Sequence, residues 1–94
     1  MRIIARKTLR TFWEHEPRAE RPLTGWYAET AKAEWANPSE VKRSFNTVDF
    51  VGDDRAVFDI GGNKYRVIAI VNFEKQAILF QAALTHEEYS RENL

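Results

Sequence analysis

The stretch from Arg55 to Phe73, RAVFDIGGNKYRVIAIVNF, gives the strongest indication of the fold. Two runs rich in β-branched and aromatic residues flank a pair of glycines, a pattern that indicates a β-hairpin turn. The run 67–71 is apolar at every position, as expected of a strand buried on both faces. We therefore predict strands over 55–60 and 65–73, with the second in the middle of a sheet.

Further elements are predicted on both sides of this hairpin. Apolar residues predict a short strand at 48–51 and a last strand at 77–84, and residues 1–4 form a short strand or an extended lead-in. Before residue 46 the apolar residues recur every three to four positions, which is the period of a helix. Helices are predicted over 5–15, over 18–36, from Asn37 as N-cap to about Phe45, and from Thr85 as N-cap through Tyr89.

This order of elements predicts an α+β fold. Two N-terminal helices would pack on a small antiparallel sheet of three to four strands, followed by a short C-terminal helix. The length of 94 residues is that of one domain, so we expect residues 1–94 to form a single domain.

Composition excludes several classes of protein. The chain has no cysteine, which excludes disulfides and thiolate metal sites. Its two histidines, His15 and His86, stand near opposite ends, so a zinc site is not favoured and we expect neither metal nor cofactor. No apolar run approaches the roughly 20 residues that span a bilayer, and the basic residues of the first ten positions precede no long apolar run, so we expect no secretory signal. We expect a cytoplasmic protein with no membrane association.

The net charge is zero, but its distribution is uneven. Residues 1–44 hold nine Lys or Arg against six Asp or Glu, whereas residues 45–94 hold five against eight. Nucleic-acid binders usually carry a basic excess. Any RNA site in this chain must therefore be a local patch.

Strand pairing brings polar residues together at one rim of the predicted sheet. With a two-residue turn, Asp59 would lie opposite Lys64, and Val57 opposite Arg66. The end of strand 77–84 would then lie beside Arg66, and the last helix follows that end directly. The residues expected to meet there are Asn63, Lys64, Arg66, His86 and Tyr89.

These residue types suit a phosphate ligand, although plainer interpretations remain open. Cations bind phosphate oxygens well, and histidine is suited to proton transfer near neutral pH. However, Lys64 and Arg66 could be solvated strand residues, with Lys64 paired to Asp59. A histidine near a helix start is more often a surface residue, and Tyr89 could fasten the last helix to the sheet.

Several segments resemble one known family. They are FDIGGNKYRVI at 58–68, THEEY at 85–89, the opening IIARKTLR at 3–10, the Trp-rich second helix and the Asn37-Pro38 helix start. Together they resemble the HigB toxins of bacterial toxin–antitoxin systems. The sequence differs from that pattern at Gly61, where many relatives have lysine, at Gln81, where arginine is common, and at Ser90, which replaces a frequent aspartate.

The resemblance implies a RelE-like fold and ribosome-dependent cleavage of mRNA. It also implies neutralisation by an antitoxin, usually a helix-turn-helix DNA-binding protein, with the toxin either monomeric or in a hetero-oligomer with that partner. The active surface of the family maps onto Arg66, His86, Lys64 and Tyr89 as catalytic residues and Asn63, Lys64 and Arg66 as RNA-binding residues.

The reaction expected from this resemblance is metal-independent transesterification. The 2′-hydroxyl of the RNA attacks the adjacent phosphate, leaving a 2′,3′-cyclic phosphate and a 5′-hydroxyl. Arg66, supported by Lys64, would stabilise the phosphorane, His86 would be the general acid or base, and Tyr89 would stack on a base or position the phosphate. The alternative is a non-catalytic module of the same fold that binds an antitoxin or the ribosome.

Overall fold

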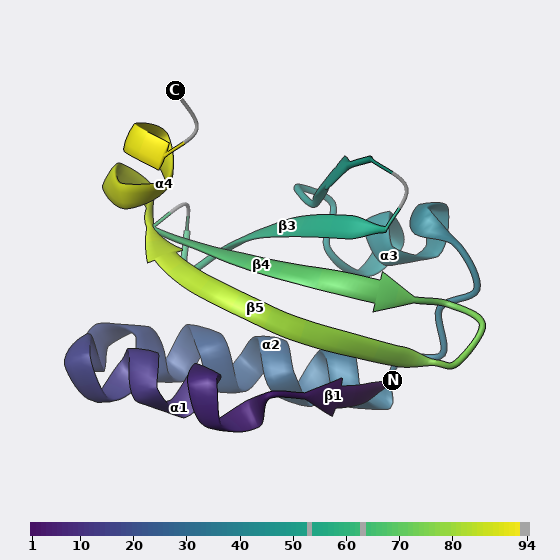
Figure 1. The fold of residues 1–94 in the computed structure, drawn as a ribbon, viewed down its shortest axis with the longest axis horizontal. Coiled ribbons are helices and arrows are strands. Elements are labelled where there is room, and N and C mark those ends of the chain that lie inside the picture. Colours follow the sequence, from purple (N-terminus) through teal and green to yellow (C-terminus); the bar gives the residue numbers. More distant parts are fainter. Residues whose placement is uncertain (53, 63, 93–94) are drawn as a thin grey trace.

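The chain adopts the predicted α+β arrangement in a computed structural model that describes residues 1–52, 54–62 and 64–92. A short first strand leads into the helices, which are followed by four strands in succession and a short last helix (Figure 1). The elements are β1 (Arg2–Ile4), α1 (Arg6–His15), the 3₁₀ turn η1 (Pro17–Ala19), α2 (Glu20–Lys32), α3 (Pro38–Ser44), β2 (Asp49–Val51), β3 (Arg55–Ile60), β4 (Tyr65–Asn72), β5 (Ala77–Thr85) and α4 (His86–Glu92).

The sheet has five strands in the order β1-β5-β4-β3-β2. It is therefore larger than the predicted three to four strands, and it is mixed, because β1 pairs parallel to β5. Arg2 lies opposite Ala77, and the Arg2 amide donates to the Gln76 carbonyl at 2.8 Å. The predicted lead-in is thus an edge strand, which satisfies the backbone groups on one side of the first residues of β5.

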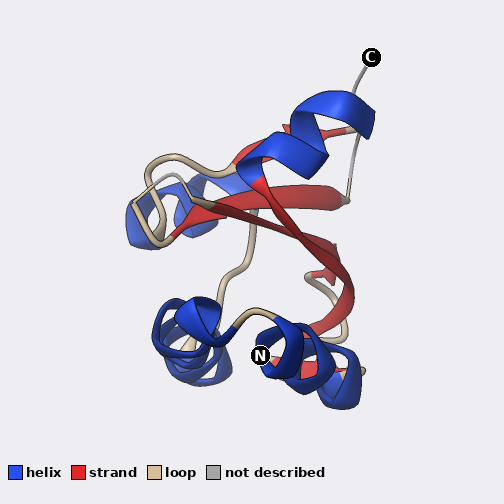
Figure 2. Cartoon of the chain, turned by 90° about the vertical axis from the view of Figure 1, so that its left-hand side faces the viewer, coloured by secondary structure: helices blue, strands red, loops and turns tan. Residues whose placement is uncertain are grey.

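One face of the sheet is covered by α1 and α2, which lie side by side (Figure 2). The alternation of side chains along β4 explains this, because Tyr65, Val67, Ala69 and Val71 are all buried while the residues between them are half-buried. The core that they form with the helices includes Leu9, Leu23, Trp26, Phe58, Ile78 and Phe80. No helix among the described residues is long and apolar enough to cross a bilayer.

The second helix ends at Lys32, four residues before the predicted end at 36. Ala33 is extended, with φ −72° and ψ 149°, and the chain then runs without regular structure to Pro38. This path buries the indole of Trp35 edge-on against Phe45, with ring centroids 6.0 Å apart, instead of continuing the helix. The residue before a proline avoids the helical backbone conformation, and Asn37, which precedes Pro38, is accordingly extended.

The hairpin register differs from the predicted one by two residues. Ile60 lies opposite Tyr65 across a four-residue connection, so Asp59 lies opposite Arg66 and not opposite Lys64. The expected pairing of Val57 with Arg66 is wrong for the same reason, because Val57 faces Ile68. A shift of two residues keeps every side chain on its own face, so the hydrophobic pattern cannot distinguish the two registers.

A bulge in β5 brings Arg66 into the register that the sequence predicted. Asn72 lies opposite Ala77, one residue away from the predicted register, but the register shifts between Ile68 and Ala69. Beyond that shift Arg66 lies opposite Leu84, as predicted. The end of β5, from which α4 begins, therefore lies beside the start of β4.

Two adjacent glycines of the hairpin provide a matched test of crowding. Both have positive φ, +63° at Gly61 and +62° at Gly62, but only Gly61 is crowded, because a Cβ there would lie 3.0 Å from Tyr65 Cδ2 and 3.2 Å from Pro22 Cγ. We expect Gly62→Ala to lower the free energy of unfolding by about 1 kcal/mol through the left-handed backbone. Gly61→Ala should lower it by about 1–3 kcal/mol more. Urea unfolding measures both values, and equal losses would contradict the crowding.

The hydroxyl of the buried Tyr65 makes the stability of the protein depend on pH in the alkaline range. Burial raises the pKa of its hydroxyl above the usual 10.0, and the negative charge of Glu16 adds to the rise, while Arg18 opposes it. The unfolded chain therefore loses this proton first, so the free energy of unfolding is unaffected below pH 10 and falls as the pH rises through the folded pKa. Tyr65→Phe should make this fall shallower, as measured by urea unfolding between pH 8 and 11. Parallel curves for the two proteins would contradict the prediction.

Candidate active site

Arg66 stands at the head of the central strand, on the face of the sheet opposite to α1 and α2. It alternates with the buried Tyr65 and Val67, and it shares its face with the half-buried Ile68 and Ile70. The side chain is only 14% exposed. The strand thus holds a cation at the rim of the sheet, next to aliphatic residues of β4, and a guanidinium in such a place is suited to an anionic ligand.

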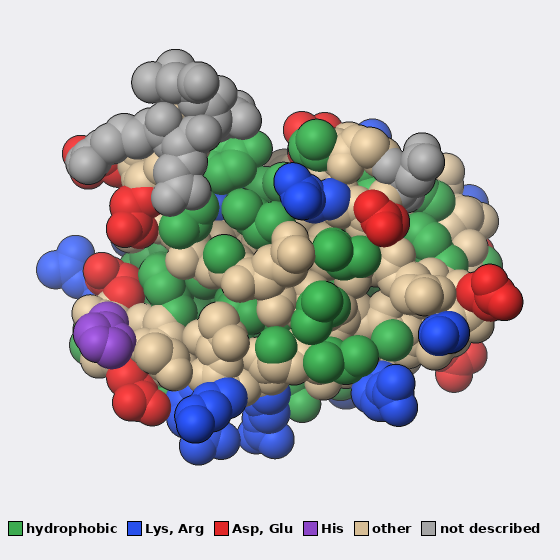
Figure 3. All heavy atoms as spheres, viewed as in Figure 1, with side chains coloured by type: hydrophobic (Ala, Val, Ile, Leu, Met, Phe, Trp, Pro, Cys, Tyr) green, Lys and Arg blue, Asp and Glu red, His purple; other side chains and the backbone are tan. Residues whose placement is uncertain are grey.

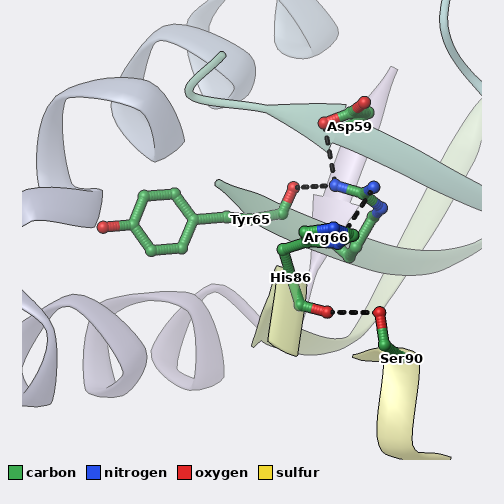
Figure 4. Close-up of polar contacts among 5 residues, drawn as sticks. All are labelled: Asp59, Tyr65, Arg66, His86 and Ser90. Atoms are coloured by element: carbon green, nitrogen blue, oxygen red, sulfur yellow. Dashed lines mark hydrogen bonds and ion pairs between the residues drawn. The ribbon is translucent and has the colours of Figure 1, made fainter. Parts of the chain in front are cut away.

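The Arg66 guanidinium is held by its neighbours in the sheet (Figure 4). Its Nη1 atom lies 2.9 Å from Asp59 Oδ1, in an ion pair between directly opposed residues of β3 and β4. The same atom donates to the Tyr65 carbonyl at 3.4 Å, while the ring of Tyr65 points away toward the helices. The ion pair is half-buried, so solvent screens it less than a pair on an open surface.

His86 begins α4 and is tied to the hairpin through its backbone. Its amide donates to the Lys64 carbonyl at 2.8 Å. Its Nδ1 atom lies 3.5 Å from Arg66 Nη2, although the two residues are 20 positions apart in sequence. A guanidinium can only donate, so Nδ1 is the acceptor in this contact, and the tautomer that fits it carries its proton on Nε2.

The predicted capping box at the start of α4 is present. The Glu88 amide donates to Thr85 Oγ1 at 3.1 Å, and the Thr85 amide donates to Glu88 Oε1 at 2.9 Å. Ser90 Oγ adds a bond of 3.0 Å to the His86 carbonyl. These bonds fix the direction in which α4 leaves β5, and with it the position of His86.

Tyr89 completes the cluster from the next turn of α4. Its ring centroid lies 5.7 Å from Arg66 Cζ, within the range of a cation–π contact. The guanidinium is therefore in contact with the carboxylate of Asp59, the imidazole of His86 and the ring of Tyr89. Such an arrangement can bind a phosphate and place a proton-carrying imidazole beside it.

The predicted site residues thus fall into three groups. The Arg66 guanidinium contacts both His86 and Tyr89. Lys64 joins them through its backbone, and its side chain is exposed. Asn63 lies outside the described residues. The sequence reasoning missed the partnership of Asp59 with Arg66, which a four-residue turn in place of a two-residue turn would have indicated.

A groove of about 780 Å³ lies on the other side of the same rim, between α1 and the end of β5. Its walls include Thr11, Phe12 and His15 of α1, and Ala83 and Thr85 of β5. Figure 3 shows Lys and Arg side chains gathered along the lower edge of the molecule, over α1, and hydrophobic side chains scattered over the strands. Within the described residues, no group of three His, Asp or Glu side chains is placed to hold a metal ion.

Comparison with known proteins identifies the family. A model of the HigB toxins, described as the RelE-like toxic component of a toxin–antitoxin system, matches residues 19–92. The chain is 33% identical over 91 residues to the mRNA interferase toxin HigB of Escherichia coli K12, covering 95% of this chain and 88% of that protein. It is 27% identical over 93 residues to the mRNA interferase HigB of Escherichia coli O6:H1, covering 97% and 90%.

The chain therefore belongs to the HigB family of RelE-like toxins. The resemblance predicted from the hairpin and the Thr-His-Glu-Glu-Tyr segment is confirmed. Membership in this family implies an antitoxin as partner.

We expect that removing the capping box lowers the local stability of α4. Thr85→Ala deletes the acceptor for the Glu88 amide, so we expect α4 to lose about 1 kcal/mol of local stability. Amide hydrogen exchange at Glu88 should then be roughly fivefold faster at unchanged global stability. Thr85→Ser keeps the hydroxyl and is the matched control. Equal exchange rates in the Ala and Ser variants would show that the cap does not hold this helix.

Proposed function

We propose that this chain is an endoribonuclease that cleaves mRNA, with Arg66, His86 and Tyr89 at its active site. The observation that carries the proposal is the contact of the Arg66 guanidinium with both His86 and Tyr89 at the rim of the sheet. Relatives at 33% identity that are named mRNA interferase HigB support the choice of substrate and reaction.

The chemistry proposed is metal-independent transesterification. The 2′-hydroxyl attacks the adjacent phosphorus, the bond to the 5′ oxygen breaks, and a 2′,3′-cyclic phosphate remains. Negative charge develops on the phosphorane, and Arg66 is placed to stabilise it, with the exposed Lys64 adding positive charge nearby. Asn63, which lies outside the described residues, is proposed to contact the RNA.

His86 is proposed to serve the leaving group. The tautomer that fits the contact with Arg66 carries its proton on Nε2, where it can hydrogen-bond the 5′ oxygen and stabilise the negative charge that develops there as the bond to phosphorus breaks. The 5′ oxygen then takes up its proton from solvent. Tyr89 is proposed to hold the guanidinium and to present its free edge or face to a base. The proton of the 2′-hydroxyl leaves to solvent or to a group of the substrate complex.

Dependence on the ribosome is part of the proposal. The chain has zero net charge, so it offers little general attraction to RNA. A ribosome that already holds the mRNA would supply the positioning that the toxin lacks. We propose in addition that the chain acts as a single domain in the cytoplasm, and that its antitoxin is a helix-turn-helix protein.

Arg66→Ala tests the proposed site. Expression of the wild-type protein in a bacterial host should arrest growth and create new mRNA 5′ ends at positions set by the reading frame. Arg66→Ala should remove both effects, with cleavage at least about 100-fold slower, because a donor that stabilises transition-state charge is lost. Arg55→Ala is the matched control, since Arg55 is an exposed arginine on the same face at the far end of β3.

The outcomes separate an enzyme from a binding module. Cleavage that persists in Arg66→Ala would remove this residue from the site. Normal growth and intact mRNA with soluble, folded wild-type protein would reject the enzyme, and would leave a non-catalytic module that binds its antitoxin or the ribosome.

A further inference from the structure

Asp59 places an acidic side chain against the Arg66 guanidinium. The two residues are directly opposed on β3 and β4, and their side chains are 23% and 14% exposed. Neither comes from a loop, so the pairing of the two strands itself sets the 2.9 Å separation of Asp59 Oδ1 and Arg66 Nη1. The sheet thus holds a carboxylate next to the cation proposed to bind phosphate.

A guanidinium is planar, so fixing one of its nitrogens restricts the direction of the others. Nη1 is held by Asp59 and by the Tyr65 carbonyl. Nη2 then lies 3.5 Å from His86 Nδ1, and Cζ lies 5.7 Å from the centre of the Tyr89 ring. Asp59 therefore acts on His86 and Tyr89 through the orientation of Arg66.

A carboxylate at this place has a cost for binding. Its negative charge repels a phosphate that approaches the same guanidinium. A site selected only for RNA affinity would lack it. The carboxylate offsets this repulsion by orienting the guanidinium. An unrestrained arginine binds phosphate in many geometries, whereas a correctly placed one accelerates the reaction.

We propose that Asp59 is a positioning residue, whose carboxylate holds the Arg66 guanidinium in the orientation that serves the scissile phosphate and fixes the tautomer of His86. The effect of Asp59 on cleavage rests on the proposed function, but its effect on His86 can be measured without any activity. The Asp59 carboxylate thus has two opposite effects, since it weakens the binding of RNA and accelerates the cleavage of bound RNA.

Asp59→Asn is the variant that tests this inference. It keeps the shape of the side chain and an oxygen acceptor, and it removes the charge. Asp49→Asn is the matched control, because Asp49 is an exposed carboxylate opposite Val57 on the same face of the sheet and its loss changes the net charge equally. Cleavage of mRNA on programmed ribosomes is measured for both, with kcat and KM determined separately.

We expect Asp59→Asn to lower kcat about tenfold or more while KM stays the same or falls, which is the pattern of an interaction that serves the transition state more than binding. Asp49→Asn should keep the wild-type kcat. Asp59→Glu, which restores the charge on a longer side chain, should recover part of the loss. An unchanged kcat in Asp59→Asn, or a higher KM together with a lower melting temperature, would overturn the inference.

The second measurement is nitrogen NMR of the His86 ring in the same proteins. In the wild type, Nδ1 should give the signal of an unprotonated nitrogen and Nε2 that of a protonated one, whereas Asp59→Asn should show a mixture of the two tautomers. If the wild type cleaves no mRNA but this difference is present, the proposed function fails and the positioning stands. If the ring signals are identical in the two proteins, Asp59 does not position Arg66.

Discussion

The pairing of β4 with a strand on each side is the constraint on which the rest of the structure depends. Its odd-numbered residues, Tyr65 to Val71, are buried against the helices, and its even-numbered residues lie on the opposite face. The hydrogen bonds to β3 and β5 leave this strand no freedom to rotate. The same alternation that builds the core therefore fixes the direction of Arg66, because its neighbours Tyr65 and Val67 cannot leave the interior.

The candidate site combines two residues held by the sheet with two residues carried by the short helix α4. Asp59 and Arg66 belong to the ladder of the sheet, whereas His86 and Tyr89 belong to a helix of seven residues that follows β5. That helix is too short to be stable alone, so its capping box and its contacts with the guanidinium hold it in place. The arginine thus retains the helix that carries the imidazole, and in the proposed function the same guanidinium also presents its charge to the phosphate.

Local features of the site could be predicted from the sequence, and long-range ones could not. The cap formed by Thr85 and Glu88 depends on residues three positions apart, so the pattern alone identified it. The hairpin register depends on whether the turn has two or four residues, and the faces of the strands are the same in both cases. The partnership of Asp59 with Arg66 follows only from the four-residue turn. The parallel pairing of β1 was missed because Arg2 and Ala77 lie 75 positions apart.

That parallel pair has a consequence for how the protein is made. A chain is synthesised from its N-terminus, so residues 2–4 leave the ribosome long before residues 77–79, to which they bind. The edge strand must wait without a partner until β5 has emerged, and α4, with its imidazole and its aromatic ring, emerges later still. Vectorial synthesis therefore joins β1 to the sheet only after the other strands have been made, and the candidate site forms after that.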